Sequence, residues 1–298
     1  MDLTRYLPGP FASRELRRLG ARVVRVEAPD GDPLRHVEPG WDAALNAGKE
    51  SVVWDRERDP ALGPSLCARA DVVLEGFRPG VAARLGVGPG DVPERIVYCS
   101  LTGFGDRDTR AGHDLNYLGW AGALASTAPA MPPLPIADLA AGGLTVVARV
   151  LAGLLERQRT GRGVRIVVSM THGAHELARF AGLLTGTLAC YRIYRCADDR
   201  FLTVAALEPK FWKRLCELIE RPDLVERQRD AHAELEAVFR RRALDEWMAL
   251  FRDEDVAVGP VATLDEASRE LATSVSNDPP PPRLGEHTAQ WRKELGLA

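Results

Sequence analysis

The sequence lacks the cysteine pattern of a secreted or zinc-binding protein. Its five cysteines are an odd number, and no two of them are spaced as a CxxC pair. This pattern indicates neither a disulfide framework nor a zinc site, and no metal site is expected. We expect buried thiols, as in a cytoplasmic protein. The five residues are Cys67, Cys99, Cys190, Cys196 and Cys216.

Long apolar runs are also missing. No stretch approaches the ~18 uninterrupted apolar residues of a membrane-spanning helix. Pro8-Gly9-Pro10 breaks the N-terminal region where a secretory signal would need its apolar core. With 45% hydrophobic and 27% charged residues, the composition is that of a soluble globular protein. We therefore predict a cytoplasmic location.

The chain has little net charge and no standard nucleotide-binding motif. A net charge of -3 provides no general attraction to nucleic acid or to acidic membranes. No Walker motif is present, and the glycines of Gly86-Val87-Gly88-Pro89-Gly90 have the wrong spacing for a dinucleotide fingerprint and follow no strand. The sequence therefore predicts neither NAD nor ATP as a cofactor.

Strands and helices alternate through the first half of the chain. The β-branched runs at 22–27, 51–54, 71–77, 95–101 and 164–168 predict strands, with helix-like segments between them. Such alternation favours a parallel, doubly wound α/β sheet, whose ligands bind beyond the carboxyl ends of the strands. One apolar stripe marks a helix that ends at Gly161; its residues are Leu144, Val147, Leu151, Leu154 and Leu155.

A change of pattern near residue 190 indicates a second lobe. Residues 191–207 are typical of a β-hairpin, 211–219 and 233–251 of helices, and 256–261 of a strand. The proline run at 278–282 is typical of a spacer or covering arm, because proline lacks the donor that a helix or inner strand needs. We predict a large domain at 1–185, a small α+β domain at 186–264, and a C-terminal arm at 265–298 that returns to the large domain.

Three residues are candidates for proton chemistry. His113 follows a predicted strand and loop, where catalytic groups collect; a role as a helix cap is about equally compatible with its position. Asp138 lies at the predicted start of a helix, where a carboxylate can act as a base or nucleophile, and where an N-cap is the more ordinary role. Glu208 follows the strand FLTVAAL and is alternatively a solvated carboxylate.

Basic residues beside three turns are candidates for holding a polyphosphate. They are Arg35, Lys49 and Arg78. Guanidinium and ammonium groups bind phosphate oxygens through charge-assisted hydrogen bonds. Each of the three, taken singly, is equally explained as a surface charge.

Nine ordered segments resemble the family III CoA-transferase superfamily. They are DLTRYLPGPFAS, LGARVVRVEAPDGDPLR, NAGKESVV, ADVVLEGFRPGVAARLGVG, IVYCSLTGFG, AGHDLNYL, PPLPIADLAAGG, LLERQRTGRG and CADDRFLTVAALEPKFW. The match runs from residue 2 to about residue 265. AGHDLNY resembles the α-methylacyl-CoA racemase branch, because the formyl-CoA and carnitine transferase branches usually lack that histidine.

The resemblance implies a Rossmann-like parallel-sheet large domain, a smaller α+β domain, and an interlocked homodimer. It further implies that His113 and Asp138 are the two catalytic bases, that Glu208 pairs with the histidine, and that Asp114 supports it. The active site would lie between the large domain of one subunit and the small domain of the other. The resemblance implies that the residues at the CoA site include Asn46, Lys49, Phe77 and Arg78. Arg35 is a further candidate because it lies beside a turn.

Three departures from the family pattern bear on this expectation. A strand-forming segment usually precedes the DLT block, so we expect either a missing first strand or a displaced start. The segment between Met170 and Cys190 is shorter than usual. Leu139-Ala140-Ala141 replaces a more glycine-rich stretch, and the added methyl groups are expected to crowd a bound thioester.

The leading prediction is a racemase that inverts the α-carbon of a 2-methylacyl-CoA thioester by two-base proton transfer. Backbone N–H groups near Asp138 are expected to stabilise the enolate oxygen. No cofactor is expected beyond the coenzyme A of the substrate. One alternative is a CoA-transferase that moves CoA between carboxylic acids through an acyl-enzyme at Asp138, which needs no histidine. A second alternative is a non-catalytic acyl-CoA binding relative.

Overall fold

The computed structural model describes residues 1–271 and 278–297 and divides the chain into two compact units. The first unit comprises 1–179 and 278–298, and the second comprises 180–277. The sequence placed the divisions at 186 and 265 instead. Residues 272–277 and 298, which the predicted C-terminal arm includes, lie outside the described residues.

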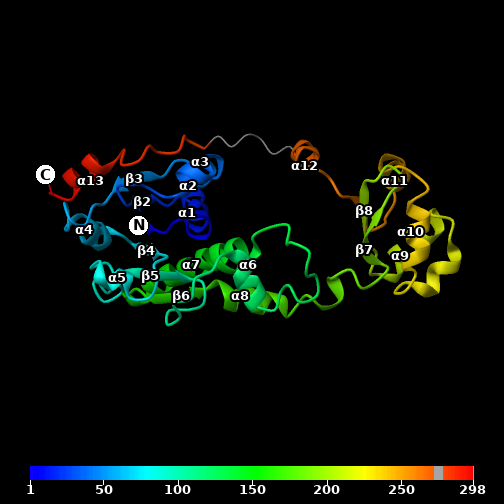
Figure 1. Cartoon of the computed structure of the whole chain (residues 1–298), viewed down its shortest axis with the longest axis horizontal. Coiled ribbons are helices and arrows are strands. Elements are labelled where there is room, and N and C mark those ends of the chain that lie inside the picture. Colours follow the sequence, from blue (N-terminus) through cyan, green and yellow to red (C-terminus); the bar gives the residue numbers. More distant parts are fainter. Residues whose placement is uncertain (272–277, 298) are drawn as a thin grey trace. The chain divides into compact units, whose positions relative to one another are not determined.

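The first unit contains a six-stranded sheet in the order β3-β2-β1-β4-β5-β6, with every pairing parallel (Figure 1). This confirms the predicted α/β class. The order reverses between β1 and β4, so a crevice is expected beyond the carboxyl ends of these two strands. The strands are β1 (Asp2–Leu3), β2 (Val24–Glu27), β3 (Glu50–Val53), β4 (Val72–Glu75), β5 (Val97–Thr102) and β6 (Arg165–Ser169).

The expectation of a missing first strand is wrong. Asp2 and Leu3 form β1, which pairs with β2 on one side and β4 on the other. The Met1 ammonium donates a hydrogen bond of 2.8 Å to the carbonyl oxygen of Val72 on β4. A strand of two residues therefore occupies the centre of the sheet, and the loop after it begins at Thr4.

Helices connect the strands of the first unit. They are α1 (Pro8–Arg18), α2 (Leu34–Val37), α3 (Pro39–Asn46), α4 (Leu62–Arg69), α5 (Val81–Arg84), α6 (Asp114–Trp120), the π-helical segment η1 (Ala137–Leu144), α7 (Thr145–Thr160), α8 (Met170–Ala178) and α13 (Thr288–Glu294). The sequence pattern missed α2, α3, α8 and α13, whereas a helix after His113 was one of its two alternatives. The first two and α13 have only four to eight residues, too few for a clear apolar period.

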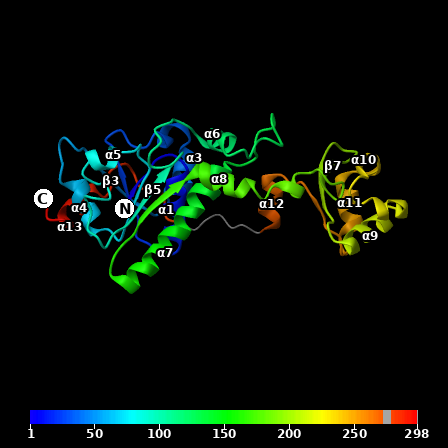
Figure 2. The same cartoon turned by 90° about the horizontal axis from the view of Figure 1, so that it is seen from below.

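The helix formed by η1 and α7 is the one described segment that is long and apolar enough to cross a membrane by length and composition. It packs beside β5 (Figure 2). Val146, Val150 and Gly153 are buried against the core of the sheet. Of the apolar stripe seen in the sequence, Val147 and Leu154 pack against the same core, whereas Leu151 and Leu155 are 38% and 64% exposed.

The C-terminal segment covers the edge strand β3. Ser51 on β3 accepts hydrogen bonds of 2.9 Å from the backbone of Gly285 and His287, at its hydroxyl and its carbonyl oxygen respectively. Val53 donates to the hydroxyl oxygen of Thr288. Because these contacts use the open edge of the sheet, the segment protects β3 from pairing with another chain.

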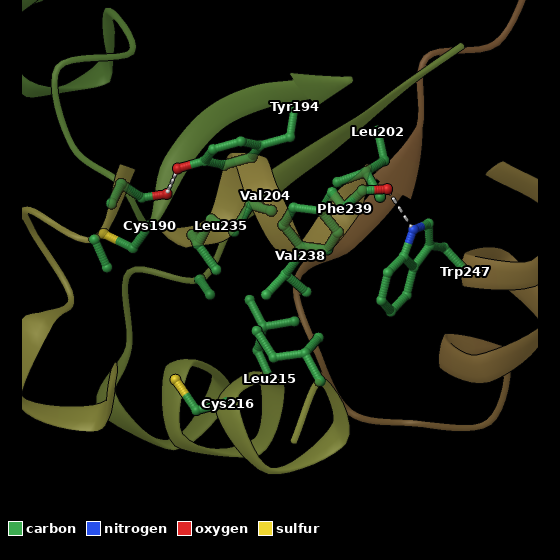
Figure 3. Packing of buried hydrophobic residues seen from close by; sticks show 14 of the residues in the cluster. Cys190, Tyr194, Leu202, Val204, Leu215, Cys216, Leu235, Val238, Phe239 and Trp247 are labelled. Carbon is green, nitrogen blue, oxygen red and sulfur yellow. Dashed lines mark hydrogen bonds between the residues drawn. The ribbon is translucent and has the colours of Figure 1, made fainter. Parts of the chain in front are cut away.

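The second unit has a small antiparallel sheet in the order β7-β8-β9. Figure 3 shows its core, where the Tyr194 hydroxyl donates to the carbonyl oxygen of Ala189 and the Trp247 indole to that of Phe239. Its elements are η2 (Gly182–Leu184), β7 (Tyr191–Arg195), β8 (Phe201–Ala205), α9 (Pro209–Leu218), η3 (Pro222–Arg227), α10 (His232–Phe239), α11 (Leu244–Phe251), β9 (Val258–Pro260) and α12 (Leu264–Glu270).

The segment predicted to be helical at 233–251 contains two helices, α10 and α11. The Glu246 carboxylate accepts a hydrogen bond from the backbone of Ala243, which caps the start of α11. The indole N–H of Trp247 donates a hydrogen bond to the carbonyl oxygen of Phe239 at the end of α10. Side chains therefore satisfy both helix ends, and the break costs little. All five cysteines are buried, as predicted.

Candidate active site

A pocket of about 700 Å³ opens at the carboxyl ends of β1, β4 and β5. Thr4, Gly76 and Thr102, which follow or end these strands, line it. This is the crevice expected where the strand order reverses, because the connections on its two sides run to opposite faces of the sheet. His113 and Asp138 both line this pocket. The structure therefore brings together the two residues that the sequence singled out for proton transfer.

His113 stands just before α6, at its N-cap position, with extended backbone. Its backbone N–H donates 3.1 Å to the side-chain oxygen of Asn116, which is one half of a capping box. The imidazole is exposed toward the pocket, and its ring lies 6.2 Å from the Tyr6 ring at 89°. His113 can therefore cap the helix and line the pocket at the same time, because its backbone caps α6 while its ring faces the pocket.

Tyr117 fixes the loop that carries His113. Its ring packs so closely on Gly103 and Gly112 that an added Cβ would lie 2.6 Å and 2.8 Å from the ring. Its hydroxyl donates a hydrogen bond to the carbonyl oxygen of Gly112. Phe104 meets the same ring edge-on, with centroids 5.3 Å apart. Since Gly112 adjoins His113, these contacts limit the movement of the histidine.

Asp138 lies in the first turn of η1, half-buried at the pocket wall. Burial, followed by the negative charge of Asp114, raises the pKa of Asp138 to about 7. A carboxyl with that pKa is a much stronger base than an ordinary aspartate and exchanges protons readily at neutral pH. π-Helical segments often occur at functional sites.

Asp114 supports Asp138 rather than His113. Its carboxylate accepts a 2.8 Å hydrogen bond from the backbone N–H of Asp138, whereas the sequence assigned it to the histidine. The N–H of Leu139 donates to the carbonyl oxygen of Pro135. The backbone donors of Asp138 and Leu139 are therefore already used, and the expectation that N–H groups at this turn stabilise an enolate oxygen is not met by these two.

The small residues after Asp138 serve close helix packing. A Cβ on Gly143 would lie 2.5 Å from the Phe11 ring of α1, and one on Gly173 of α8 would lie 2.9 Å from the methyl group of Ala141. Ala141 is buried and is not part of the pocket wall. Its methyl group is directed at α8, so the expected crowding of a thioester at this residue does not occur.

Phe77 and Arg78 line the pocket on the loop after β4, and their predicted contact with coenzyme A stays a prediction. The guanidinium of Arg78 is on an exposed residue, and its backbone carbonyl accepts from Val81 at the start of α5. Arg5 and Tyr6 also line the pocket, and neither was predicted from the sequence. Their position directly after β1 was the available signal, but the strand was too short to recognise.

Lys49 is not available to a ligand. Its side chain is completely buried, with the ammonium 3.6 Å from the Asp2 carboxylate and 2.7 Å from the Ser13 hydroxyl. Asn46 accepts from the same ammonium at 2.9 Å and donates to Asp42. Burial lowers the pKa of Lys49 to about 8, although Asp2 opposes the shift. The predicted roles of Lys49 and Asn46 at coenzyme A are therefore replaced by internal roles, because both side chains already have buried partners.

Arg35 also has an internal partner. Its guanidinium donates two hydrogen bonds of 2.8 Å to the Glu27 carboxylate, and it does not line the pocket. Glu208 lies in the second unit, exposed, between β8 and the first residue of α9. Its predicted pairing with His113 stays a prediction. Among the described residues no cluster of histidine, cysteine, aspartate or glutamate is arranged to hold a metal ion.

A family model described as CoA-transferase family III matches residues 1–278. The chain belongs to this family. The α-methylacyl-CoA racemase of Homo sapiens is 31% identical over 360 residues, which cover 100% of this chain and 92% of that protein. The succinyl-CoA:glutarate CoA-transferase of Mus musculus is 27% identical and covers 99% and 85% respectively. Both kinds of family III enzyme are thus similar to the chain.

A crystal structure from M. tuberculosis shows the same fold. The structure of Rv3272 superposes with a TM-score of 0.84 at 31% identity, covering 97% of this chain and 96% of that one. The corresponding sequence is described as a probable fatty acyl-CoA transferase. The family III architecture is therefore retained here with both of its sheets.

The shifted pKa of Asp138 predicts how stability depends on pH. An unfolded aspartate has a pKa of about 3.9, so the folded chain holds this proton more tightly. The resulting stabilisation is complete below about pH 4 and is lost as the pH rises toward and past 7. Asp138→Asn lacks the ionisation, so its free energy of unfolding relative to wild type should increase by about 2 kcal/mol from pH 5 to pH 8.

Urea unfolding of both proteins at several pH values measures this difference. Asp223→Asn is the control, because a hydrogen bond from Arg221 lowers the pKa of that exposed carboxyl. Asp223 therefore titrates only below about pH 4, and its replacement should not change the pH dependence of stability between pH 5 and pH 8. A constant difference between Asp138→Asn and wild type from pH 5 to pH 8 would show that the Asp138 pKa is not raised.

Proposed function

We propose that this family III protein is an α-methylacyl-CoA racemase, which interconverts the two epimers of a 2-methylacyl-CoA. The observation that carries the proposal is that His113 and Asp138 line the same pocket and that the pKa of Asp138 is raised to about 7. Inversion requires one base on each face of the α-carbon. The two bases should also have similar strength, because the epimers are almost equal in free energy and the reaction runs both ways.

In the proposed reaction one base takes the α-proton next to the thioester carbonyl, and the electron pair of the C–H bond moves into the enolate. The protonated second base then gives its proton to the opposite face of the planar carbon. This leaves the first base protonated and the second deprotonated, and exchange with solvent resets them. An aspartate with a pKa of about 7 can accept the proton in one direction of the reaction and donate it in the other at neutral pH.

Coenzyme A enters as part of the substrate, and the proposed reaction uses no other cofactor. The second candidate is CoA transfer between carboxylic acids, favoured by the similarity to named transferases. In that reaction the Asp138 carboxylate attacks the thioester carbonyl and expels CoA thiolate, which attacks the Asp138 carbonyl of the mixed anhydride and releases the first acid. The acceptor carboxylate then attacks the Asp138–CoA thioester, and the expelled CoA thiolate attacks the acceptor acyl carbon and frees Asp138. A pKa of about 7 leaves a substantial ionised fraction of Asp138 at neutral pH and is compatible with either reaction. The presence of His113 in the same pocket favours the racemase, because CoA transfer needs no histidine.

Deuterium exchange separates the two functions. The wild-type protein, given one epimer of a 2-methylacyl-CoA in deuterated water, should place deuterium at the α-carbon while the other epimer accumulates. Asp138→Ala and His113→Ala should each lower the interconversion rate by a factor of at least about 100, because each removes a proton-transfer group. Mass spectrometry and chiral chromatography give the two readouts.

A transferase would behave differently in the same experiment. It would exchange CoA with an added free acid, retain activity in His113→Ala, and leave the α-position free of deuterium. That outcome would replace the racemase by the transferase. Binding of several branched acyl-CoAs without either reaction would instead support a non-catalytic binding protein.

The pocket loop with Phe77 and Arg78 is the proposed coenzyme A contact. Arg78→Ala should raise the dissociation constant for CoA about tenfold, because a charge-assisted hydrogen bond to phosphate is lost at an exposed position. Arg58→Ala is the control, since this side chain is 89% exposed and the pocket does not include it. Calorimetric titration with CoA decides the matter, and equal affinity in all three proteins would remove Arg78 from the site.

A homodimer is proposed as the working state. Leu144, Leu151 and Leu155 lie on one side of the η1–α7 helix, with about two turns between the first pair and about one turn between the second. Their exposed fractions are 51%, 38% and 64%. Leu177 on α8 is 49% exposed. Exposed leucines that share a helix face are typical of an interface, because they gain free energy when a second surface removes them from water.

The double variant Leu151→Lys with Leu155→Lys should shift the protein from dimer to monomer, because two charges would be buried without partners in the interface. Sedimentation equilibrium measures the change. Leu264→Lys is the matched control, as Leu264 on α12 is 84% exposed and lies on a different unit. A wild-type monomer at micromolar concentration that remains fully active would contradict the dimer.

A further inference from the structure

Tyr6 has an unusual backbone for an aromatic residue. Its φ is 64°, in the left-handed region that favours glycine, whereas most tyrosines avoid it. The residue directly follows the strand and loop of Leu3–Arg5 and lines the pocket. Backbone strain of this kind persists only where surrounding contacts enforce it, and it occurs preferentially at functional sites.

Asp32 enforces this conformation. Its carboxylate accepts a 3.0 Å hydrogen bond from the backbone N–H of Tyr6. The same carboxylate lies 3.1 Å from the guanidinium of Arg25, and both side chains are completely buried. Its other oxygen accepts 2.9 Å from the N–H of Leu34. Because Asp32 is held from several sides, the strained turn at Tyr6 has a rigid anchor.

The strained turn directs the Tyr6 ring toward His113. The two rings meet at 89° with centroids 6.2 Å apart, which is an edge-to-face contact. No other hydrogen bond or ring contact holds the imidazole among the described residues, since the Asn116 bond reaches only the backbone N–H of His113. The Tyr6 ring is therefore the side-chain group that limits rotation of the imidazole.

We propose that Tyr6 is a positioning residue, which holds the imidazole of His113 in the orientation that reaches the α-carbon. This inference rests on the proposed proton transfer. The ring and not the hydroxyl performs the role, because the contact is an edge-to-face contact between the two rings. A misplaced general base loses rate even when substrate still binds, so the effect should fall on kcat rather than KM.

Three variants test the proposal by racemisation kinetics and thermal unfolding. Tyr6→Gly removes the ring but suits the positive φ, so its Tm should equal or exceed that of wild type while kcat falls about tenfold. Tyr6→Phe keeps the ring and should retain kcat within about twofold. Glu220→Gly is the matched control: Glu220 has a φ of 57° in the second unit, so the change relieves similar strain away from the pocket and should leave kcat unchanged.

Proton NMR gives a readout that does not depend on activity. The ring C–H resonances of His113, assigned by their loss in His113→Ala, should move in Tyr6→Gly and stay in place in Tyr6→Phe. Wild-type kcat in Tyr6→Gly, an effect confined to KM, or equal losses in the Phe and Gly variants would each overturn the positioning role. If the wild-type protein shows no α-proton exchange, the proposed racemase fails, and unmoved His113 resonances in Tyr6→Gly would separately overturn the contact.

Discussion

The structure depends on charge pairs that are buried beneath the carboxyl end of the central strands. Asp2 on β1 lies against the ammonium of Lys49, and Ser13 of α1 donates to the same carboxylate. Burial acts to raise the pKa of Asp2, but Lys49 and the hydrogen bonds from Ser13 and Thr4 outweigh it and lower that pKa. Removing one partner would leave the other charge buried and unpaired, which is far more costly than the pair itself.

This charged layer shapes the pocket without entering it. Asp2 accepts from the backbone N–H of Thr4, and Asp32 accepts from that of Tyr6, so the two carboxylates hold the loop after β1 at alternate residues. Arg25 pairs with Asp32 and with Asp42, which ties the loop to β2 and α3. A two-residue strand makes few ladder hydrogen bonds of its own. Side chains therefore supply the order that a longer strand would have provided.

Close packing on the other side of the pocket positions the second group of reactive residues. The absence of a side chain at Gly103 and Gly112 admits the Tyr117 ring, and the same absence at Gly143 admits Phe11. The first contact holds the His113 loop and the second holds the segment that begins beside Asp138. Burial of Asp138, followed by the negative charge of Asp114, raises its pKa to about 7.

The sequence by itself determined the alternating α/β pattern, the antiparallel second unit, and the loops that carry His113, Asp138, Phe77 and Arg78. These depend on local periodicity and on the rule that ligands gather at the carboxyl ends of parallel strands. Tertiary structure decided that Lys49, Asn46 and Arg35 serve internal pairs, that Asp114 holds Asp138, and that Tyr6 meets His113. A charged residue has the same appearance in a sequence whether its partner is a phosphate or a carboxylate forty residues away, because burial and partner choice arise only when distant segments pack together.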